Sequence, residues 1–79
     1  MPILITKKFV NPETSEESVS TYQVSCLNCM VKDFLFTRTF LSRFGNVRFE
    51  EETNGFTAYL KKEKQEEVLI GEFHIFFIE

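Results

Sequence analysis

Tryptophan is absent from this sequence, alanine occurs once, and the 79 residues include only three glycines, two prolines and two cysteines. The glycines stand alone, so the chain has no glycine-rich loop of the kind that binds phosphate. No uninterrupted apolar run approaches the roughly 20 residues of a membrane span, and we therefore expect no membrane segment. The amino terminus places Lys7 and Lys8 after a short apolar stretch, which is the wrong order for a secretion signal.

The length predicts a single domain, residues 1–79, because so small a chain buries only about 60% of its unfolded surface. Twelve acidic and nine basic side chains give a formal charge of −3, which argues against a nucleic-acid backbone as the default partner. Two cysteines without a secretion signal indicate reduced thiols and a cytoplasmic location. A disulfide between Cys26 and Cys29 is possible, but it would close too small a loop to staple the fold.

Phenylalanine is abundant, with ten copies. Residues with AT-rich codons (Phe, Tyr, Met, Ile, Asn and Lys) number 29, whereas those with GC-rich codons (Gly, Ala, Arg and Pro) number nine. This skew indicates an AT-rich genome, as many bacteriophages and some bacteria have. It concerns the source of the chain and not its chemistry.

The apolar pattern predicts an α+β fold in the order ββαβββ, with one helix packed across a small antiparallel sheet. Segments 2–10 and 19–25 read as strands around a polar loop, 11–18. A helix over 28–44 should have Asn28 as N-cap, with Gly45 just beyond its end. Its buried face should comprise Leu27, Met30, Val31, Phe34, Leu41 and Phe44.

The rest of the chain reads as a β-meander. A two-residue turn at Asn54-Gly55 should join strands 47–53 and 56–60, with Phe49 opposite Leu60. The inner face of this hairpin should hold Val47, Phe49, Phe56, Ala58 and Leu60, and the outer face Arg48, Glu50, Glu52, Thr57, Tyr59 and Lys61. The last strand, 68–78, is apolar on both faces and should lie centrally, beside the first strand. Its residues facing the helix should be Leu69, Gly71, Phe73, Ile75 and Phe77, and those facing away Val68, Ile70, Glu72, His74, Phe76 and Ile78.

A second apolar stripe of the helix holds Cys29, Phe36 and Phe40. The stripe could complete an ordinary core if the segment 11–26 covers it. Alternatively, Phe36 and Phe40 form a dimer or partner contact, because monomers rarely expose large apolar patches. A chain this small gains stability by pairing, so we expect a homodimer or an obligate partner.

Cys26-Leu27-Asn28-Cys29 lies at a strand-to-helix junction, where the helix N-terminus favours a thiolate. This placement is similar to the redox site of thioredoxins and glutaredoxins, which implies thiol–disulfide exchange by Cys26 and Cys29. Those families also have a proline in a later loop facing the dithiol, whereas Pro2 and Pro12 both precede the motif here. Without such chemistry, the two cysteines are expected to be small buried fillers.

For other catalytic sites and for a metal site, the sequence lacks the residues that would complete them. Tetrahedral zinc needs four ligands, and beyond the cysteine pair only His74 supplies a nitrogen, so we expect neither a metal nor a cofactor. His74 could pair with Glu72 on the same strand face, but no serine completes a triad. Glu50 and Glu52 have the spacing of a glycosidase pair, about 7 Å, but a domain with one helix offers no substrate cleft. We predict that the chain is not an enzyme.

Acidic residues concentrate in residues 47–79, which hold eight acidic and four basic side chains. An acidic face could dock on a basic protein. Tyr59 and Phe76 could instead stack single-stranded bases, although the neighbouring acids would repel phosphates. The sequence thus predicts a small acidic protein-interaction module, an inhibitor encoded by a phage or mobile element and acting on a protein in the host cytoplasm. Its expected binding residues are Glu50, Glu52, Tyr59, Glu72, His74 and Phe76.

Overall fold

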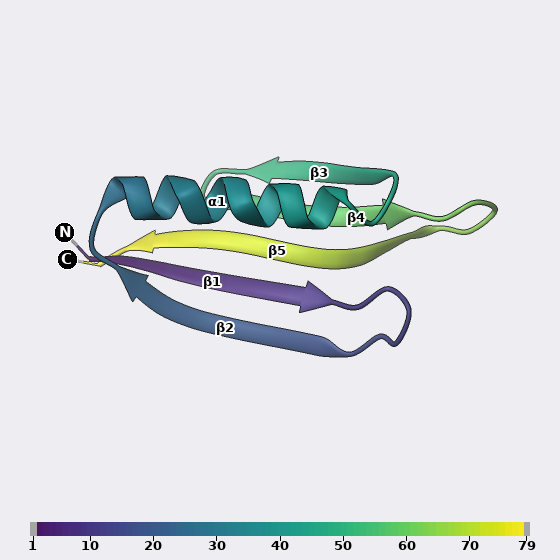
Figure 1. The fold of residues 1–79 in the computed structure, drawn as a ribbon, viewed down its shortest axis with the longest axis horizontal. Helices are drawn as coiled ribbons and strands as arrows, with labels where there is room; N and C mark the ends of the chain where they lie inside the picture. The colour runs from purple at the N-terminus through teal and green to yellow at the C-terminus, as the bar shows by residue number, and fades with distance from the viewer. Residues whose placement is uncertain (1, 79) are drawn as a thin grey trace.

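The computed structural model describes residues 2–78, which form one antiparallel sheet and one helix in the predicted order ββαβββ. The elements are β1 (Ile3–Val10), β2 (Glu17–Val24), α1 (Leu27–Ser42), β3 (Val47–Glu52), β4 (Gly55–Lys61) and β5 (Glu67–Phe77). The strand order in the five-stranded sheet is β2-β1-β5-β4-β3, so the last strand is central and pairs with the first, as predicted (Figure 1).

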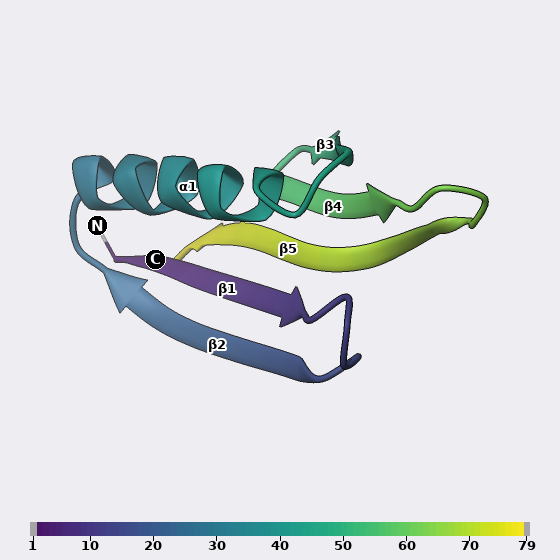
Figure 2. The same cartoon turned by 45° about the vertical axis from the view of Figure 1, so that its right-hand side comes forward.

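The helix lies along one face of the sheet, and the hydrophobic core fills the layer between them (Figure 2). Phe56 and Phe73, neighbours on β4 and β5, stack with ring centroids 5.8 Å apart, and both are fully buried. Phe34 of α1 meets both rings edge-on, at 5.3 and 5.5 Å. The remaining buried apolar residues are Ile3, Ile5, Leu41, Ala58, Leu60 and Ile70.

The helix begins and ends two residues or less from the predicted limits, but its N-cap is different. Cys26, not Asn28, has the extended backbone of an N-cap, and its sulfur accepts the N–H of Cys29 at 3.2 Å. At the other end, Arg43 is the C-cap and Gly45 follows with φ of +131°, a conformation that favours glycine.

The buried side of α1 is rotated relative to the prediction. Met30, Phe34, Leu41 and Phe44 pack on the core as expected, whereas Leu27 and Val31 are 62% and 45% exposed. Thr37 is buried on the sheet side instead. Two polar contacts hold this orientation: Asp33 with Lys7 of β1, and Arg38 with Glu51 of β3. These ion pairs bind opposite flanks of the helix to separate strands.

The hairpin of β3 and β4 turns at Thr53-Asn54, so the predicted turn at Asn54-Gly55 is wrong by one residue. Glu52 lies opposite Gly55, and Phe49 opposite Ala58 rather than Leu60. The register shift is two residues, which leaves the inner and outer faces as predicted. The reason lies on β5, because the Asn54 carbonyl accepts the Ile75 N–H at 2.8 Å and so extends the pairing into the expected turn.

Strand β5 contains a bulge that the sequence pattern did not reveal. Ala58 lies opposite Gly71 and Tyr59 opposite Leu69, so Ile70 is an extra residue. The alternation of faces reverses there. Ile70, predicted to face away from the helix, is fully buried in the core, and Val68 lies opposite the inward-facing Leu60. For the residues after the bulge, 71–77, the predicted inner and outer faces are correct.

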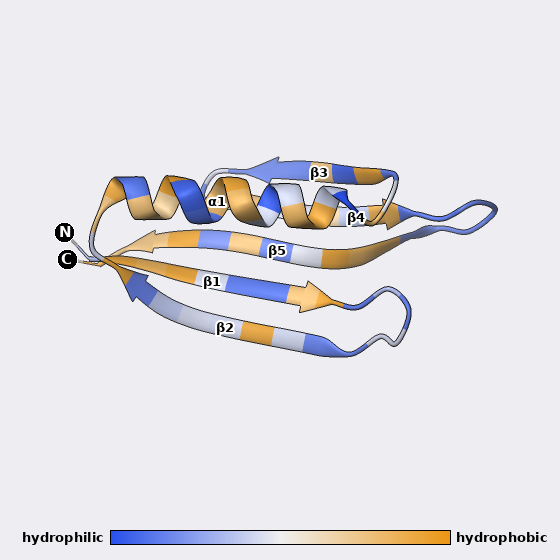
Figure 3. Ribbon diagram, viewed as in Figure 1, coloured by the Kyte–Doolittle hydropathy of each residue, from blue (hydrophilic) through white to orange (hydrophobic). Residues whose placement is uncertain are grey.

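The first hairpin has a shorter loop than predicted, because β2 starts at Glu17. The side chain of Asn11 accepts the N–H groups of Glu13 and Thr14, at 2.9 and 3.4 Å, which tightens the turn. In the hydropathy colouring of Figure 3, β2 is mostly pale or blue, unlike its neighbour β1 and the central strand β5. Across residues 2–78, no helix has the length and apolar character to cross a membrane.

Two phenylalanines on opposite faces of β5 test this core assignment. Phe73 is fully buried and Phe76 is 48% exposed. We expect Phe73→Ala to lower the free energy of unfolding by about 3–5 kcal/mol and Phe76→Ala by no more than about 1 kcal/mol. Urea denaturation followed by circular dichroism measures both values. Equal losses would contradict the assignment of faces.

Candidate interaction surface on the open face of the sheet

The face of the sheet opposite α1 is left uncovered by the described part of the chain (Figure 2). Three of its carboxylates lie around Thr57: Glu50 and Glu72 are its neighbours in the register, and Glu52 accepts its hydroxyl. Lys8 of β1 lies opposite Glu72 but forms its salt bridge with Glu17, at 3.5 Å. The centre of this face therefore carries more acidic than basic groups.

Glu52 and His74 form a contact across the edge of this acidic group. One carboxylate oxygen of Glu52 is hydrogen-bonded to Nε2 of His74, and the other accepts the Thr57 hydroxyl at 3.4 Å. The predicted partner of His74 was Glu72, its neighbour along the same strand. The register explains the difference, because His74 lies opposite Gly55, which itself pairs with Glu52.

Arg48 organises the other end of the face. Its guanidinium donates to both carboxylate oxygens of Glu67, at 2.9 and 3.2 Å, and lies 4.8 Å from the centre of the Tyr59 ring. A third contact reaches Glu50 at 3.4 Å. Donation from Arg48 lowers the pKa of the Glu67 carboxyl, and the same hydrogen bond raises the pKa of Arg48.

The six residues predicted for the binding site all belong to this outer face: Glu50, Glu52, Tyr59, Glu72, His74 and Phe76. The two aromatic residues, however, are far apart. Tyr59 pairs with Leu69, whereas Phe76 pairs with Leu4, seven residues further along β5, which corresponds to about 23 Å of strand. The face therefore has an acidic centre and does not present its two rings side by side.

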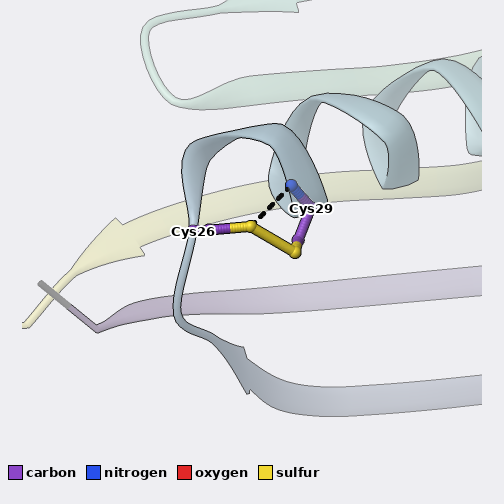
Figure 4. The surroundings of a disulfide bond; sticks show 2 residues. All are labelled: Cys26 and Cys29. Atoms are coloured by element: carbon purple, nitrogen blue, oxygen red, sulfur yellow. Dashed lines mark hydrogen bonds between the residues drawn. A yellow bond between two sulfur atoms is a disulfide. The ribbon is translucent and has the colours of Figure 1, made fainter.

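Cys26 and Cys29 form a disulfide at the N-terminus of α1 (Figure 4). Both residues are exposed, so the expectations of reduced thiols and of buried fillers are wrong for this structure. The strand β2 ends two residues before the first cysteine, and the Cys26 sulfur caps the helix. The site is open to a molecule in solution and lies beyond the ends of the strands.

A polar cluster between α1 and the sheet was not anticipated from the sequence. Asp33 accepts the Lys7 ammonium at 2.7 Å and the hydroxyl of Tyr22, and Thr37 donates to the Asp33 carbonyl at 2.7 Å. A signal was present: Lys7 occupies an inward position of β1, between Ile5 and Phe9. An inward lysine requires an acidic partner from the covering helix.

Phe36 and Phe40 lie on the flank of α1 that faces β1 and β2. Phe36 is 72% exposed, while Phe40 meets the Phe9 and Phe44 rings edge-on, at 5.3 and 5.5 Å. An open cavity of about 230 Å³ lies between this flank and the two strands. It is lined by Lys7, Lys8, Phe9, Ser18, Ser20, Phe36, Thr37, Phe40 and Leu41.

Within residues 2–78, the structure brings together no group of three or more His, Cys, Asp or Glu side chains suited to hold a metal ion. Comparisons with models of protein families, with curated proteins and with solved structures find no match. Any function must therefore be inferred from the geometry of the chain itself.

The Arg48–Glu67 pair has a measurable signature. Arg48→Gln removes the bidentate donor, so we expect the pKa of Glu67 to rise toward its ordinary range. Because that pKa is lowered in the fold, the pair stabilises the protein above the ordinary carboxyl range, and this stabilisation disappears as the pH falls through the lowered value. Carbon-13 NMR titration of the carboxyl measures the shift. Arg43→Gln, which removes an equal charge at the end of α1, should leave the Glu67 titration unchanged.

Proposed function

We propose that this protein is a non-enzymatic interaction module that docks the acidic outer face of its sheet on a basic surface of another protein. The observation that carries the proposal is the gathering of Glu50, Glu52 and Glu72 on a sheet face that no helix covers among residues 2–78. Charged groups at such a surface steer association and select an oppositely charged partner.

The surroundings of these carboxylates support recognition of a protein. The Glu50 and Glu52 side chains are 55% and 40% exposed, so a partner can reach them. Phe76, at one end of the face, is 48% exposed and supplies apolar contact area. Interfaces commonly combine an aromatic anchor with a polar rim.

The same features speak against a single-stranded nucleic acid as ligand. Successive bases stack on neighbouring aromatic rings. Here the Arg48 guanidinium lies over the Tyr59 ring, and Phe76 lies far from Tyr59 along the sheet. The carboxylates between them would repel phosphates.

The codon skew and the small size of the chain favour a protein encoded by a phage or mobile element. In this reading the module inhibits a host protein in the host cytoplasm by occupying a surface that normally binds an acidic molecule. The target would then be a protein whose natural ligand carries negative charge.

Capture from lysate with matched variants tests the acidic face. Glu50→Gln, Glu52→Gln and Glu72→Gln together remove three charges from the face without changing side-chain size. Glu13→Gln, Glu16→Gln and Glu63→Gln remove the same charge from exposed loops. We expect wild type and the loop variant to retain one stoichiometric partner, identified by mass spectrometry, and the face variant to capture at least about tenfold less. Equal capture by all three baits would contradict the proposal.

The disulfide of Cys26 and Cys29 supports a second candidate function, thiol–disulfide exchange. In the reduced protein, the Cys26 thiolate would attack a disulfide in a substrate, form a mixed disulfide and release one substrate thiolate. Cys29 would then attack the Cys26 sulfur, which restores the internal disulfide and releases the second substrate thiolate. Two electrons pass from the dithiol to the substrate. The amide of Cys29, which donates to the Cys26 sulfur, favours Cys26 as the attacking group.

Single-cysteine variants measure this chemistry. Cys29→Ser retains Cys26, and Cys26→Ser retains Cys29, so each reports one sulfur. With oxidised glutathione as probe, we expect the Cys26 thiolate to form the mixed disulfide at least about tenfold faster than Cys29. Mass spectrometry of quenched samples gives the two rates. If both sulfurs react at the rate of an unactivated thiol, the redox function is excluded. A Cys26→Ser bait in the capture experiment separates the two functions, because the acidic face does not need the dithiol.

A further inference from the structure

Strand β2 is an open edge of the sheet, at the margin opposite β3 (Figure 1). It pairs with β1 over all eight residues, from Glu17 opposite Val10 to Val24 opposite Ile3. Six of its eight residues are exposed, including Val19 at 64%. An edge strand of this length has a row of unpaired backbone groups that can accept another strand.

The hydrogen bonds of β5 identify which backbone groups are free. The Ile75 N–H donates to the Asn54 carbonyl on the β4 side, so Ile75 makes no ladder hydrogen bond to its neighbour Ile5. By the alternation of an antiparallel sheet, Ile5 instead bonds to Tyr22. The even-numbered residues of β2 therefore face β1. The N–H and C=O groups of Val19, Thr21 and Gln23 point to the open side.

Charge distinguishes the two edges of the sheet. The other edge strand, β3, carries three consecutive acids, Glu50 to Glu52. Pairing with β3 of a second copy would bring like charges together. Strand β2 has no charged residue after Glu17, which is held by Lys8. In an antiparallel pair of β2 strands, the two copies of Glu17 lie at opposite ends. Strand β2 is thus complementary to itself, whereas β3 is not.

The helix flank beside this edge has apolar surface to cover. Phe36 and Phe40 line the same cavity as Ser18 and Ser20 of β2. A strand added beyond β2 extends the floor of that cavity and covers part of the exposed phenyl surface. Backbone pairing and apolar burial thus favour the same approach.

We propose that β2 pairs antiparallel with β2 of a second copy, which makes one continuous sheet of ten strands. The two-fold axis is perpendicular to the sheet, so both helices lie on one side and both acidic faces on the other. This inference is independent of the proposed function, because Glu50, Glu52 and Glu72 lie on other strands and take no part in the pairing.

Sedimentation over a concentration series measures the dimer, with two substitutions at one position as the test. Thr21→Pro removes an outward N–H and leaves the bonds to β1 in place, as edge strands tolerate proline at such positions. Thr21→Val keeps the N–H and the branched shape. We expect the dissociation constant of the dimer to rise about tenfold or more for Thr21→Pro and to stay within about threefold of wild type for Thr21→Val.

Amide exchange by NMR identifies the interface. In the dimer, the amides of Val19, Thr21 and Gln23 should gain at least about tenfold protection as concentration rises, while Ser20 and Tyr22 stay protected throughout. Circular dichroism confirms that both variants fold. A chain that stays monomeric at millimolar concentration overturns the proposal and leaves the edge to a strand of another protein. A dimer without new protection at the odd-numbered residues also overturns it, since the contact then lies elsewhere. A monomeric Thr21→Pro variant that still captures the acidic-face partner separates this result from the proposed function.

Discussion

The packing of Phe34 against the stacked rings of Phe56 and Phe73 is the contact on which the rest of the structure depends. It joins the helix to the two strands at the middle of the chain's only described core, and burial of such rings is the main stabilising term available to so short a chain. The ion pairs Lys7–Asp33 and Arg38–Glu51 orient the helix but add little to the free energy of unfolding, because partly exposed pairs contribute little stability. They fix how α1 is rotated, and that rotation decides which phenylalanines remain at the surface.

A single covering helix gives the two faces of the sheet different roles. The inner face packs the hydrophobic core against α1, whereas the outer face arranges its charges in pairs and leaves a surplus of carboxylates. The arrangement follows from the alternation of β3, β4 and β5, which places Glu50, Glu52, Thr57, Glu72 and His74 on the outer face. Pairing through β2 would place two such surfaces on one side of a dimer. A partner with two basic sites at a suitable separation would then bind more tightly by avidity, without any new type of contact.

Local patterns predicted the element order, the central position of the last strand and the outer-face position of the β3 and β4 residues, because alternation survives small errors in register. The hairpin of Val47 to Lys61 shows this well: its turn is displaced by one residue, yet Glu50 and Glu52 keep their face. The errors arose where a distant contact decides the outcome. The bulge at Ile70 depends on pairing with β4, and the exposure of Leu27 and Val31 depends on ion pairs with β1 and β3. Neither can be read from helical or strand periodicity alone. The position of Glu50, Glu52 and Glu72 on one face was predictable from strand alternation, while the partner of His74 required the register of three strands.

The two ends of the described chain lie side by side at one end of the sheet, where the Ile78 N–H donates to the Pro2 carbonyl at 3.1 Å (Figure 1). The loop between β4 and β5 projects from the opposite end of a molecule 45 Å long. Residues 2–78 are therefore suited to circular permutation, with a short linker joining Ile78 to Pro2 and new termini opened in residues 63–66. In such a permutant β5 and β1 would become a hairpin, and the sheet's central pair would form between neighbours in sequence. Folding should accelerate, because the closure of the longest loop no longer precedes the pairing of the two central strands.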